Sequence, residues 1–598
     1  MSISASAMGT MYYVDPRTGS DSHTGSLSDP WRTVSSSIPK LQAGDTLFLR
    51  EGIYLEDNIN INVRGTDFHH IAIKNYENES PVIDGGYKEF RSVPNSDWEL
   101  FEAARNIYRS VKTYANAGLV HGYLDPGGNM SHLVPYENYE HLSSHNENYT
   151  ETGSVYVGPG VFWNSSDQRI YIRLQPSRQG RIMGYTIPSN VNPGQHEICI
   201  VPDGAGLHFK SNAAYIDIEG IDIRYRDNAL LFETGSHHIS VRNAHILGGR
   251  SHIKVTNNVH HLIFDSVTIN DSFPPWVAWS DVKRGTKPAH SLQQVAIGLK
   301  NGVHDVEIRN SLFKNIFDGI GAASKVYNVY IQNNEFHGIR DDVIQLGTAS
   351  YNVDIGFNKM IHVSKGPGRN GSGHSVHPGT KYIHHNIIDL KEKYLYFRAG
   401  DPHYTESGDG MSWHVAFGSH SDDKGYIDPW KIYNNTIIAG EMRNANYHDK
   451  GVGYAYKGVF NGVPQEVYNN IFIQTRDYIM ETGIDVSDGA HILDGNLYYK
   501  KVPGSNPLFR DWDDGTRESD FHTLSQFRSD NFFAVTQSHY PPGWENSGVE
   551  ADPQLDNQYR PLAGSPAGSG AIDLSSNGWP GTHDGGFRGA QPYVVDKQ

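Results

Sequence analysis

The chain has 598 residues and a formal net charge of −17, with 67 Asp and Glu residues against 50 Lys and Arg residues. This acidic balance, together with the lack of a basic run, argues against nucleic acid or an anionic membrane as a partner. No uninterrupted apolar run approaches the roughly 20 residues that a membrane-spanning helix needs. The 62 glycines and 35 tyrosines, against only 9 methionines, favour short strands and many turns.

The first 97 residues carry motifs typical of the start of a stacked-coil protein. These are Tyr12-Tyr-Val-Asp-Pro16, Pro30-Trp-Arg-Thr33 and Ala43-Gly-Asp-Thr-Leu-Phe-Leu-Arg50. They resemble the cap and first coil of many right-handed parallel β-helix carbohydrate enzymes. The resemblance implies an all-β solenoid fold and leaves the reaction open, because lyases and hydrolases share this cap. We therefore expect residues 1–97 to form an N-terminal cap and the first coils.

Residues 98–201 break the pattern that surrounds them. Their alternating apolar and polar residues, as in Arg169-Ile-Tyr-Ile-Arg173, are typical of antiparallel strands. This segment is predicted to be an inserted β-rich subdomain. The single cysteine, Cys199, lies in the strand-like run Glu197–Val201 and is interpreted as a buried thiol; one cysteine excludes an internal disulfide framework.

From residue 202 to 500 the sequence repeats with a period of about 24 residues. Asn310, Asn334 and Asn358 occupy matching positions at spacings of 24, between β-rich runs. Looser copies occur later in the chain, at Asn386, Asn435, Asn470 and Asn496. Earlier copies occur at Asn243 and, with aspartate in place of asparagine, at Asp265. A period of this length allows three short strands and three turns per coil, so these residues are predicted to form the main parallel β-helix.

The repeated asparagine is interpreted as a structural residue. A turn position suits the left-handed conformation that Asn tolerates, and side-chain amides on stacked coils can hydrogen-bond along the stack. Coils stack about 4.8 Å apart. Residues 501–598 are expected to form the last coils and a cap, because an open final coil would expose unpaired strand edges.

The same register predicts a carboxylate cluster. Asp318 follows Asn310 by eight residues, and Asp342 follows Asn334 by eight residues, so the two aspartates should stack on neighbouring coils. Asp341 directly precedes Asp342, which brings three carboxylates within about two coil rises, or ~10 Å. Such crowding pushes pKa values apart, as acid–base catalysis requires. The alternative is that these aspartates cap turns or form ion pairs.

The sequence Asp318-Gly-Ile, the pair Asp341-Asp342 and a downstream Gly373-His374 resemble the polygalacturonase family of inverting β-helix glycosidases. The resemblance implies an inverting glycosidase in which Asp318 matches the family's lone aspartate, Asp341 and Asp342 match its pair, and His374 matches its histidine. Our hypothesis for the mechanism is direct displacement by water, with Asp342 as acid, Asp318 or Asp341 as base, and His374 as a positioning group. Inverting enzymes of this kind separate their carboxyl groups by about 6.5–9.5 Å. The family's usual Asn-Thr before the first aspartate is replaced here by Ile316-Phe317.

Five further residues in the same stretch are candidate substrate-binding groups. Arg398 could contact a uronate carboxylate, and Trp413 could stack on a sugar ring. The others are His362, Lys365 and His414. Histidines are frequent here, but no tight ligand spacing typical of a metal site stands out, and hydrolysis would require no cofactor.

Two other functions stay open. A polysaccharide lyase or uronate epimerase would use a Lys, Arg or His base, for which Lys254, Arg250 and His252 are candidates. Asp318, Asp341 and Asp342 would then bind Ca²⁺. A carbohydrate-binding β-helix without catalysis is the third hypothesis.

In each case the partner is a polysaccharide or oligosaccharide. We expect a monomer with a secreted or periplasmic location, although the first nine residues lack the charged start and apolar stretch of a signal peptide.

Overall fold

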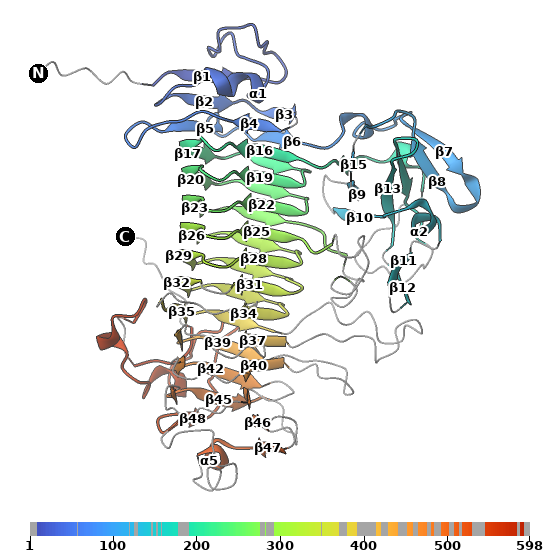
Figure 1. Cartoon of the computed structure of the whole chain (residues 1–598). Coiled ribbons are helices and arrows are strands. Elements are labelled where there is room, and N and C mark those ends of the chain that lie inside the picture. Colours follow the sequence, from blue (N-terminus) through green and yellow to red (C-terminus); the bar gives the residue numbers. More distant parts are fainter. Residues whose placement is uncertain are drawn as a thin grey trace, which may run out of the picture. The chain divides into compact units, whose positions relative to one another are not determined.

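The computed structural model is shown in Figure 1. It describes residues 9–590 except 57, 116, 119, 125–129, 145–146, 151–152, 157, 177–189, 275–281, 283–291, 348–349, 370–378, 391–413, 420–428, 440–450, 458–464, 475–479, 484–491, 502–507, 514–516, 529–543 and 583–585. The chain divides into two compact units. The first consists mainly of residues up to Gly298, together with Asn315–Phe317, and the second mainly of residues from Leu299 onward.

The chain is an all-β, right-handed parallel β-helix with an inserted β-rich subdomain, as the sequence predicts. In the first unit the coils form three parallel sheets. The first sheet contains β1 (Met11–Val14), β2 (Thr46–Leu49), β5 (Ile71–Asn75), β17 (Ala214–Glu219), β20 (His237–Arg242) and β23 (His260–Asp265). The second contains β3 (Gly52–Leu55), β6 (Pro81–Asp84), β18 (Asp222–Arg224), β21 (His245–Leu247) and β24 (Thr268–Asn270). The third contains β4 (Ile59–Ile61), β16 (Ala205–Phe209), β19 (Asn228–Phe232) and β22 (Ser251–Val255).

The inserted subdomain interrupts the first unit between β6 and β16. Its main sheet has the order β15-β9-β10-β13-β14-β8-β7, and neighbouring strands are antiparallel except β10 with β13. The strands are β7 (Trp98–Glu102), β8 (Ile107–Ser110), β9 (His121–Leu124), β10 (Ser131–Pro135), β13 (Gly160–Asn164), β14 (Arg169–Arg173) and β15 (Ile198–Val201). A hairpin of β11 (Glu147–Thr150) and β12 (Gly153–Tyr156) and the helix α2 (Tyr139–Ser143) complete it. Cys199 is fully buried in β15, as predicted.

Within the first unit, the subdomain contacts the β-helix through a buried polar cluster. The Tyr123 hydroxyl accepts a hydrogen bond from the main-chain N–H of Gly249 at 2.9 Å and donates to Asp271 at 3.3 Å. His252 Nε2 lies 3.2 Å from the Asp271 carboxylate, and His132 Nδ1 lies 3.9 Å from it. Beside His132 lies His121, which is also fully buried. The cluster joins β9 and β10 of the subdomain to β22 and the segment after β24.

The second unit continues the three-sheet pattern. The first sheet contains β26 (His304–Arg309), β29 (Tyr327–Gln332), β32 (Tyr351–Gly356), β35 (Lys381–His384), β38 (Trp430–Tyr433), β41 (Gln465–Tyr468) and β44 (Ile492–Asp494). The second contains β27 (Leu312–Lys314), β30 (Glu335–His337), β33 (Lys359–Ile361), β36 (Ile387–Asp389), β39 (Thr436–Ala439), β42 (Ile471–Gln474), β45 (Leu497–Lys500) and β48 (Val549–Glu550). The third contains β28 (Asp318–Ala322), β31 (Asp342–Leu346), β34 (Lys365–Arg369), β37 (His414–Ser419), β40 (Gly451–Lys457), β43 (Met480–Gly483), β46 (Phe509–Asp513) and β47 (Arg517–Phe521), with β46 and β47 antiparallel. The strand β25 (Val295–Leu299) spans the boundary between the two units in sequence.

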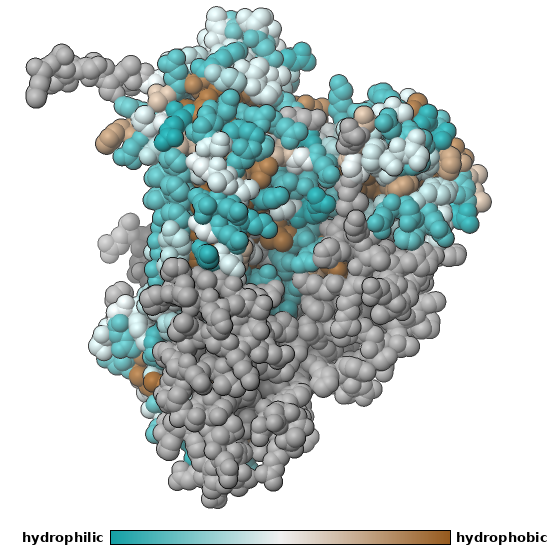
Figure 2. Space-filling model, in the orientation of Figure 1, coloured by the Kyte–Doolittle hydropathy of each residue, from teal (hydrophilic) through white to brown (hydrophobic). Residues whose placement is uncertain are grey.

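Helices are short wherever the structure describes them. They are α1 (Val34–Ser37), η1 (Ile38–Lys40), η2 (Lys88–Phe90), η3 (Ala103–Arg105), η4 (Pro193–Gln195), α5 (Leu524–Phe527), η6 (Pro566–Gly568) and η7 (Ser575–Asn577), besides α2. Among the described residues, no helix is long and apolar enough to cross a membrane. On the face drawn in Figure 2, the described surface of the first unit is mainly hydrophilic, with scattered apolar spots.

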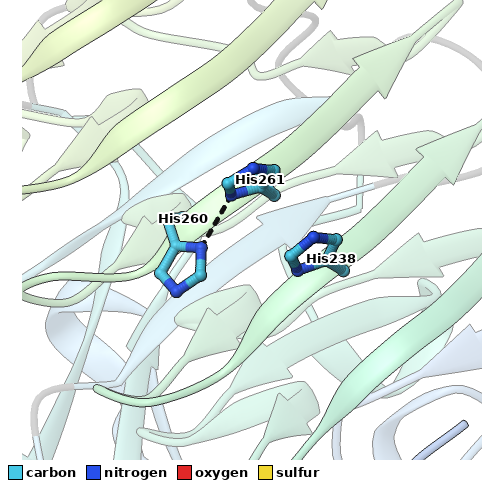
Figure 3. Close-up of side chains that lie close together, drawn as sticks. All are labelled: His238, His260 and His261. Atoms are coloured by element: carbon cyan, nitrogen blue, oxygen red, sulfur yellow. Dashed lines mark hydrogen bonds between the residues drawn. The ribbon is translucent and has the colours of Figure 1, made fainter. Parts of the chain in front are cut away.

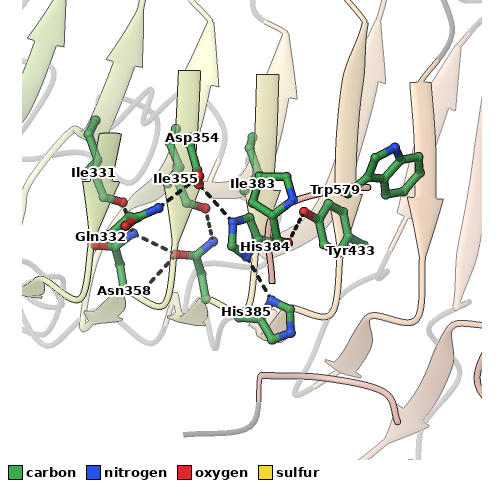
Figure 4. Close-up of polar contacts among 12 residues, drawn as sticks. Ile331, Gln332, Asp354, Ile355, Asn358, Ile383, His384, His385, Tyr433 and Trp579 are labelled. Atoms are coloured by element: carbon green, nitrogen blue, oxygen red, sulfur yellow. Dashed lines mark hydrogen bonds and ion pairs between the residues drawn. The ribbon is translucent and has the colours of Figure 1, made fainter. Parts of the chain in front are cut away.

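The repeated asparagines form a buried ladder in the second unit. It runs through Asn334, Asn358, Asn386, Asn435, Asn470 and Asn496 and ends on the carboxylate of Glu545. Each Oδ1 within the ladder accepts the main-chain N–H and the side-chain amide of the preceding asparagine at 2.8–3.0 Å. Part of the ladder, around Asn358, is drawn in Figure 4. The predicted hydrogen bonding along the stack is therefore confirmed.

The prediction that these asparagines themselves adopt the left-handed conformation is wrong, because that conformation occurs one residue earlier in the chain. The residue before each ladder asparagine has the positive φ, for example Asn333, Phe357 and His385. Asn310 and Asn243 have positive φ themselves, and it is Ser311 whose main-chain N–H donates to Asn334 Oδ1 at 2.9 Å. The ladder position needs an amide pointing into the stack, so the turn itself is made by the residue before it.

Candidate active site

Three charged residues begin three successive strands of the third sheet in the second unit. Asp318 is the first residue of β28, Asp342 of β31 and Lys365 of β34. The register pairs Ile320 with Ile344, which aligns Asp318 with Asp342, and pairs Asp342 directly with Lys365. Neighbouring strands lie about 4.8 Å apart, so these side chains form a row across three coils. The stacking of Asp318 and Asp342 follows the spacing in the sequence.

Lys365 contacts the aspartates directly. Its ammonium nitrogen lies 2.5 Å from Asp341 Oδ1 and 3.6 Å from Asp342 Oδ1. Asp318, Asp341 and Asp342 each place a carboxylate oxygen within 4.8 Å of the other two. Asp342 also accepts a hydrogen bond from the side-chain amide of Gln345 at 2.8 Å. The result is a compact group of three carboxylates and one ammonium.

The group is largely shielded from water. The Asp341 side chain is 1% exposed, while those of Asp342 and Lys365 are 13% and 10% exposed. Burial by itself would lower the pKa of Lys365, but the Asp342, Asp341 and Asp318 carboxylates outweigh it and hold that pKa above its usual value. Lys365 therefore carries a positive charge as long as no other cation lies beside the three carboxylates.

The trio fits a hard divalent cation. Ca²⁺ and Mg²⁺ prefer carboxylate oxygens, and three carboxylates that offer oxygens within 4.8 Å of one another are a suitable set of ligands. The predicted inverting arrangement is defined by a different quantity, a separation of about 6.5–9.5 Å between whole carboxyl groups. The same three carboxylates are therefore candidates both for a cation site and for an acid and a base.

The other predicted site residues are only partly described. His374, Arg398 and Trp413 lie outside the described residues. His414 begins β37, the next strand of the same sheet, but its side chain is outside the described part of the chain. His362 is half-buried in the turn between β33 and β34, three residues before Lys365. Lys365, predicted to bind substrate, lies against the aspartates. Its spacing of 23 residues from Asp342, which is one coil, is the signal in the sequence for this contact.

The residues proposed as an alternative base, Lys254, Arg250 and His252, all lie in the first unit, and Arg250 and His252 have acidic partners there. His252 is fully buried and lies beside Asp271. The Arg250 guanidinium lies 2.8 Å from the Asp227 carboxylate and 3.7 Å from that of Asp203. These contacts give His252 and Arg250 a structural role within the first unit.

Comparison with known proteins gives partial matches. No family model matches the chain. The chain is similar to the uncharacterized protein YwoF of Bacillus subtilis, with 40% identity over 91 residues, which are 15% of this chain and 18% of that protein. It is also similar to pectate lyase PEL9 of Emericella nidulans, with 31% identity over 178 residues, which are 29% of this chain and 40% of that protein. The matched stretches thus span less than half the length of either relative.

Among solved structures, the complex of XylC with xylose is similar over 92% of this chain and 87% of that chain, with a TM-score of 0.44 and 14% identity. Pectate lyase Pel9A is similar over 98% of this chain and 97% of that chain, with a TM-score of 0.34 and 11% identity. The assignment of this chain to the parallel β-helix fold stands on its own strand register.

Proposed function

We propose that this protein is a polysaccharide lyase that cleaves a uronate-containing polysaccharide by β-elimination. The observation that carries the proposal is the contact of Lys365 with the aspartate trio. Elimination beside a uronate carboxylate needs a base and a means of neutralising that carboxylate. The partial similarity to pectate lyase PEL9 supports this reaction class over hydrolysis.

In this proposal Asp318, Asp341 and Asp342 hold a divalent cation such as Ca²⁺. When bound, the cation would neutralise the substrate carboxylate and make the neighbouring C–H bond more acidic. With their charge balanced by the cation, the carboxylates would no longer hold the pKa of Lys365 high, and burial would favour the neutral amine.

The neutral Lys365 amine takes the proton from the carbon next to the uronate carboxylate. The electron pair of that C–H bond forms a carbon–carbon double bond, and the glycosidic C–O bond on the next carbon breaks. The departing oxygen takes up a proton from water, so the products are an unsaturated uronate end and an intact new sugar end. This sequence uses Lys365 as catalytic base and the aspartates as cation ligands.

Hydrolysis by the aspartates is the competing function. It uses the same three carboxylates as acid and base, and it requires neither the cation nor the Lys365 amine. The two functions therefore differ in product, in cation dependence and in the effect of replacing Lys365. A secreted or periplasmic location and a monomeric state remain predictions.

The test is turnover of neutral, sulfated and uronate-containing polysaccharides, with Ca²⁺ or EDTA, following reducing ends and the ultraviolet absorbance of unsaturated uronates together. We expect both signals to rise on a uronate polysaccharide, to be lost in EDTA and to be lost in Lys365→Met. Lys359→Met, which removes an exposed lysine 3.4 Å from Glu335 on the neighbouring sheet, is the matched control and should keep full activity. Reducing ends without absorbance, insensitive to EDTA, would replace the lyase by a hydrolase; no turnover of any polymer would leave the non-catalytic carbohydrate-binding hypothesis.

A further inference from the structure

Four histidines form a square array on two neighbouring coils of the first unit. His237 and His238 lie in β20, and His260 and His261 lie 23 residues later in β23, with His237 paired to His260 in the sheet register. The rings of His237 and His260 are stacked with centroids 5.0 Å apart, and those of His238 and His261 with centroids 4.2 Å apart. Figure 3 shows three of these rings turned toward one another.

The backbone places the second ring of each pair beside the first. Consecutive residues of a regular strand point to opposite faces of a sheet. Here His238 and His261 have φ values of 52° and 54°, in the left-handed region, which breaks that alternation. As a result Nδ1 of His237 lies 2.7 Å from Nδ1 of His238, and Nδ1 of His260 lies 2.7 Å from Nδ1 of His261.

Three of these rings together have the geometry of a metal site. His238, His260 and His261 each offer a ring nitrogen within 4.8 Å of the other two. Two nitrogens bonded to one tetrahedral ion at about 2.0–2.1 Å lie roughly 3.3 Å apart, a separation that falls within this limit. The fourth ring has a different partner: His237 Nε2 lies 3.3 Å from the Arg64 guanidinium.

The environment suits neutral imidazole ligands. His238 and His260 are half-buried and His261 is exposed, so an ion can enter from solvent. Burial, followed by repulsion from the neighbouring histidines, lowers the pKa of His238 to about 4. Its ring is therefore neutral at neutral pH, and Tyr215 supports it with a stacked ring 4.7 Å away.

We propose that His238, His260 and His261 form a binding site for a late first-row divalent metal ion such as Zn²⁺, separate from the aspartate trio. Imidazole nitrogens select Zn²⁺, Ni²⁺ and Cu²⁺, whereas Ca²⁺ and Mg²⁺ prefer carboxylate oxygens. Three protein ligands leave a fourth tetrahedral position for solvent or for a ligand atom from outside the chain. This site does not depend on the proposed lyase activity.

The test is calorimetric titration of the full chain, freed of metal with EDTA and dialysed, with ZnCl₂ as the probe. Visible absorption of bound Co²⁺ reports whether the site is tetrahedral. The test variant is the double substitution His260→Gln with His261→Asn, because Asn tolerates the left-handed conformation at position 261. The matched control is His245→Gln, which replaces an exposed histidine in β21 beside Asp222.

We expect the double variant to bind one fewer Zn²⁺ per chain, or to bind it at least about tenfold more weakly, and to lose the tetrahedral Co²⁺ spectrum. The His245→Gln control should keep the stoichiometry and the affinity. Thermal unfolding in EDTA should be the same for all variants, which separates loss of ligands from loss of fold. Unchanged Zn²⁺ binding in the double variant, or an equal loss of Zn²⁺ binding in His245→Gln, would overturn the proposal.

Discussion

Replacing Asn358 by Ala should destabilise the coils around it far more than the loss of one short side chain suggests. The Asn358 amide donates to the Ile331 carbonyl at 2.8 Å and to Asn386 Oδ1 at 2.9 Å. Its Oδ1 accepts the main-chain N–H and the side-chain amide of Asn334, both at 3.0 Å. Figure 4 shows this residue between its neighbouring coils. The substitution removes all four hydrogen bonds inside a buried stack.

The magnitude follows from these contacts. A typical hydrogen bond contributes about 0.5–1.5 kcal/mol net, and a buried group left without a partner costs about 1–3 kcal/mol. Four lost bonds therefore cost about 4 kcal/mol. Coils interact mainly with their neighbours, so the loss should be local. It corresponds to a roughly 10³-fold increase in the equilibrium constant for local opening.

Hydrogen exchange followed by mass spectrometry measures this opening segment by segment. Peptides that cover β29, β32 and β35 should lose about three decades of protection, whereas those of the first unit should not change. Glu335→Ala, an exposed position in β30, is the control, because exposed ion pairs contribute about 0–1 kcal/mol. A loss of less than about tenfold in Asn358→Ala, equal to that of the control, would refute the ladder as a major source of stability.

Two further predictions concern buried charge. Lys365→Met should destabilise the second unit by about 3–5 kcal/mol in EDTA, because it leaves the buried Asp341 carboxylate uncompensated. Added Ca²⁺ should restore most of this in a urea titration, and equal midpoints with and without Ca²⁺ would contradict the cation site. Burial lowers the pKa of His121 well below its usual value and also lowers that of His132, so both are neutral when folded. Above the unfolded-state pKa of about 6.5, such a ring is neutral in both the folded and the unfolded chain. Below it, only the unfolded chain binds the proton, so the free energy of unfolding falls by up to ~1.4 kcal/mol per pH unit for each ring. The first unit should therefore unfold more readily on acidification, and His121→Phe should flatten that dependence in unfolding midpoints measured at a series of pH values; an unchanged slope would count against it.

Local repetition in the sequence was enough to predict the solenoid. The spacing of Asn334 and Asn358 gave the coil length, and the interruption between residues 98 and 201 indicated the subdomain, which contains β7 to β15. The stacking of Asp318 on Asp342 followed from the same spacing. These features are readable because each coil repeats its neighbour, so one period fixes which residues lie side by side.

Distances and ring directions were decided only by the tertiary structure. The repeat placed Lys365 one coil after Asp342, but only the folded turns bring its ammonium group to Asp341 and draw the three carboxylates within 4.8 Å. The left-handed conformation one residue before each ladder asparagine was equally hidden, as were the turned rings of His238 and His261. The contact of Tyr123 with Asp271 joins residues 148 positions apart. A repeat specifies which coil a residue belongs to, whereas side-chain contacts depend on turn geometry and on long-range closure, which carry no period in the sequence.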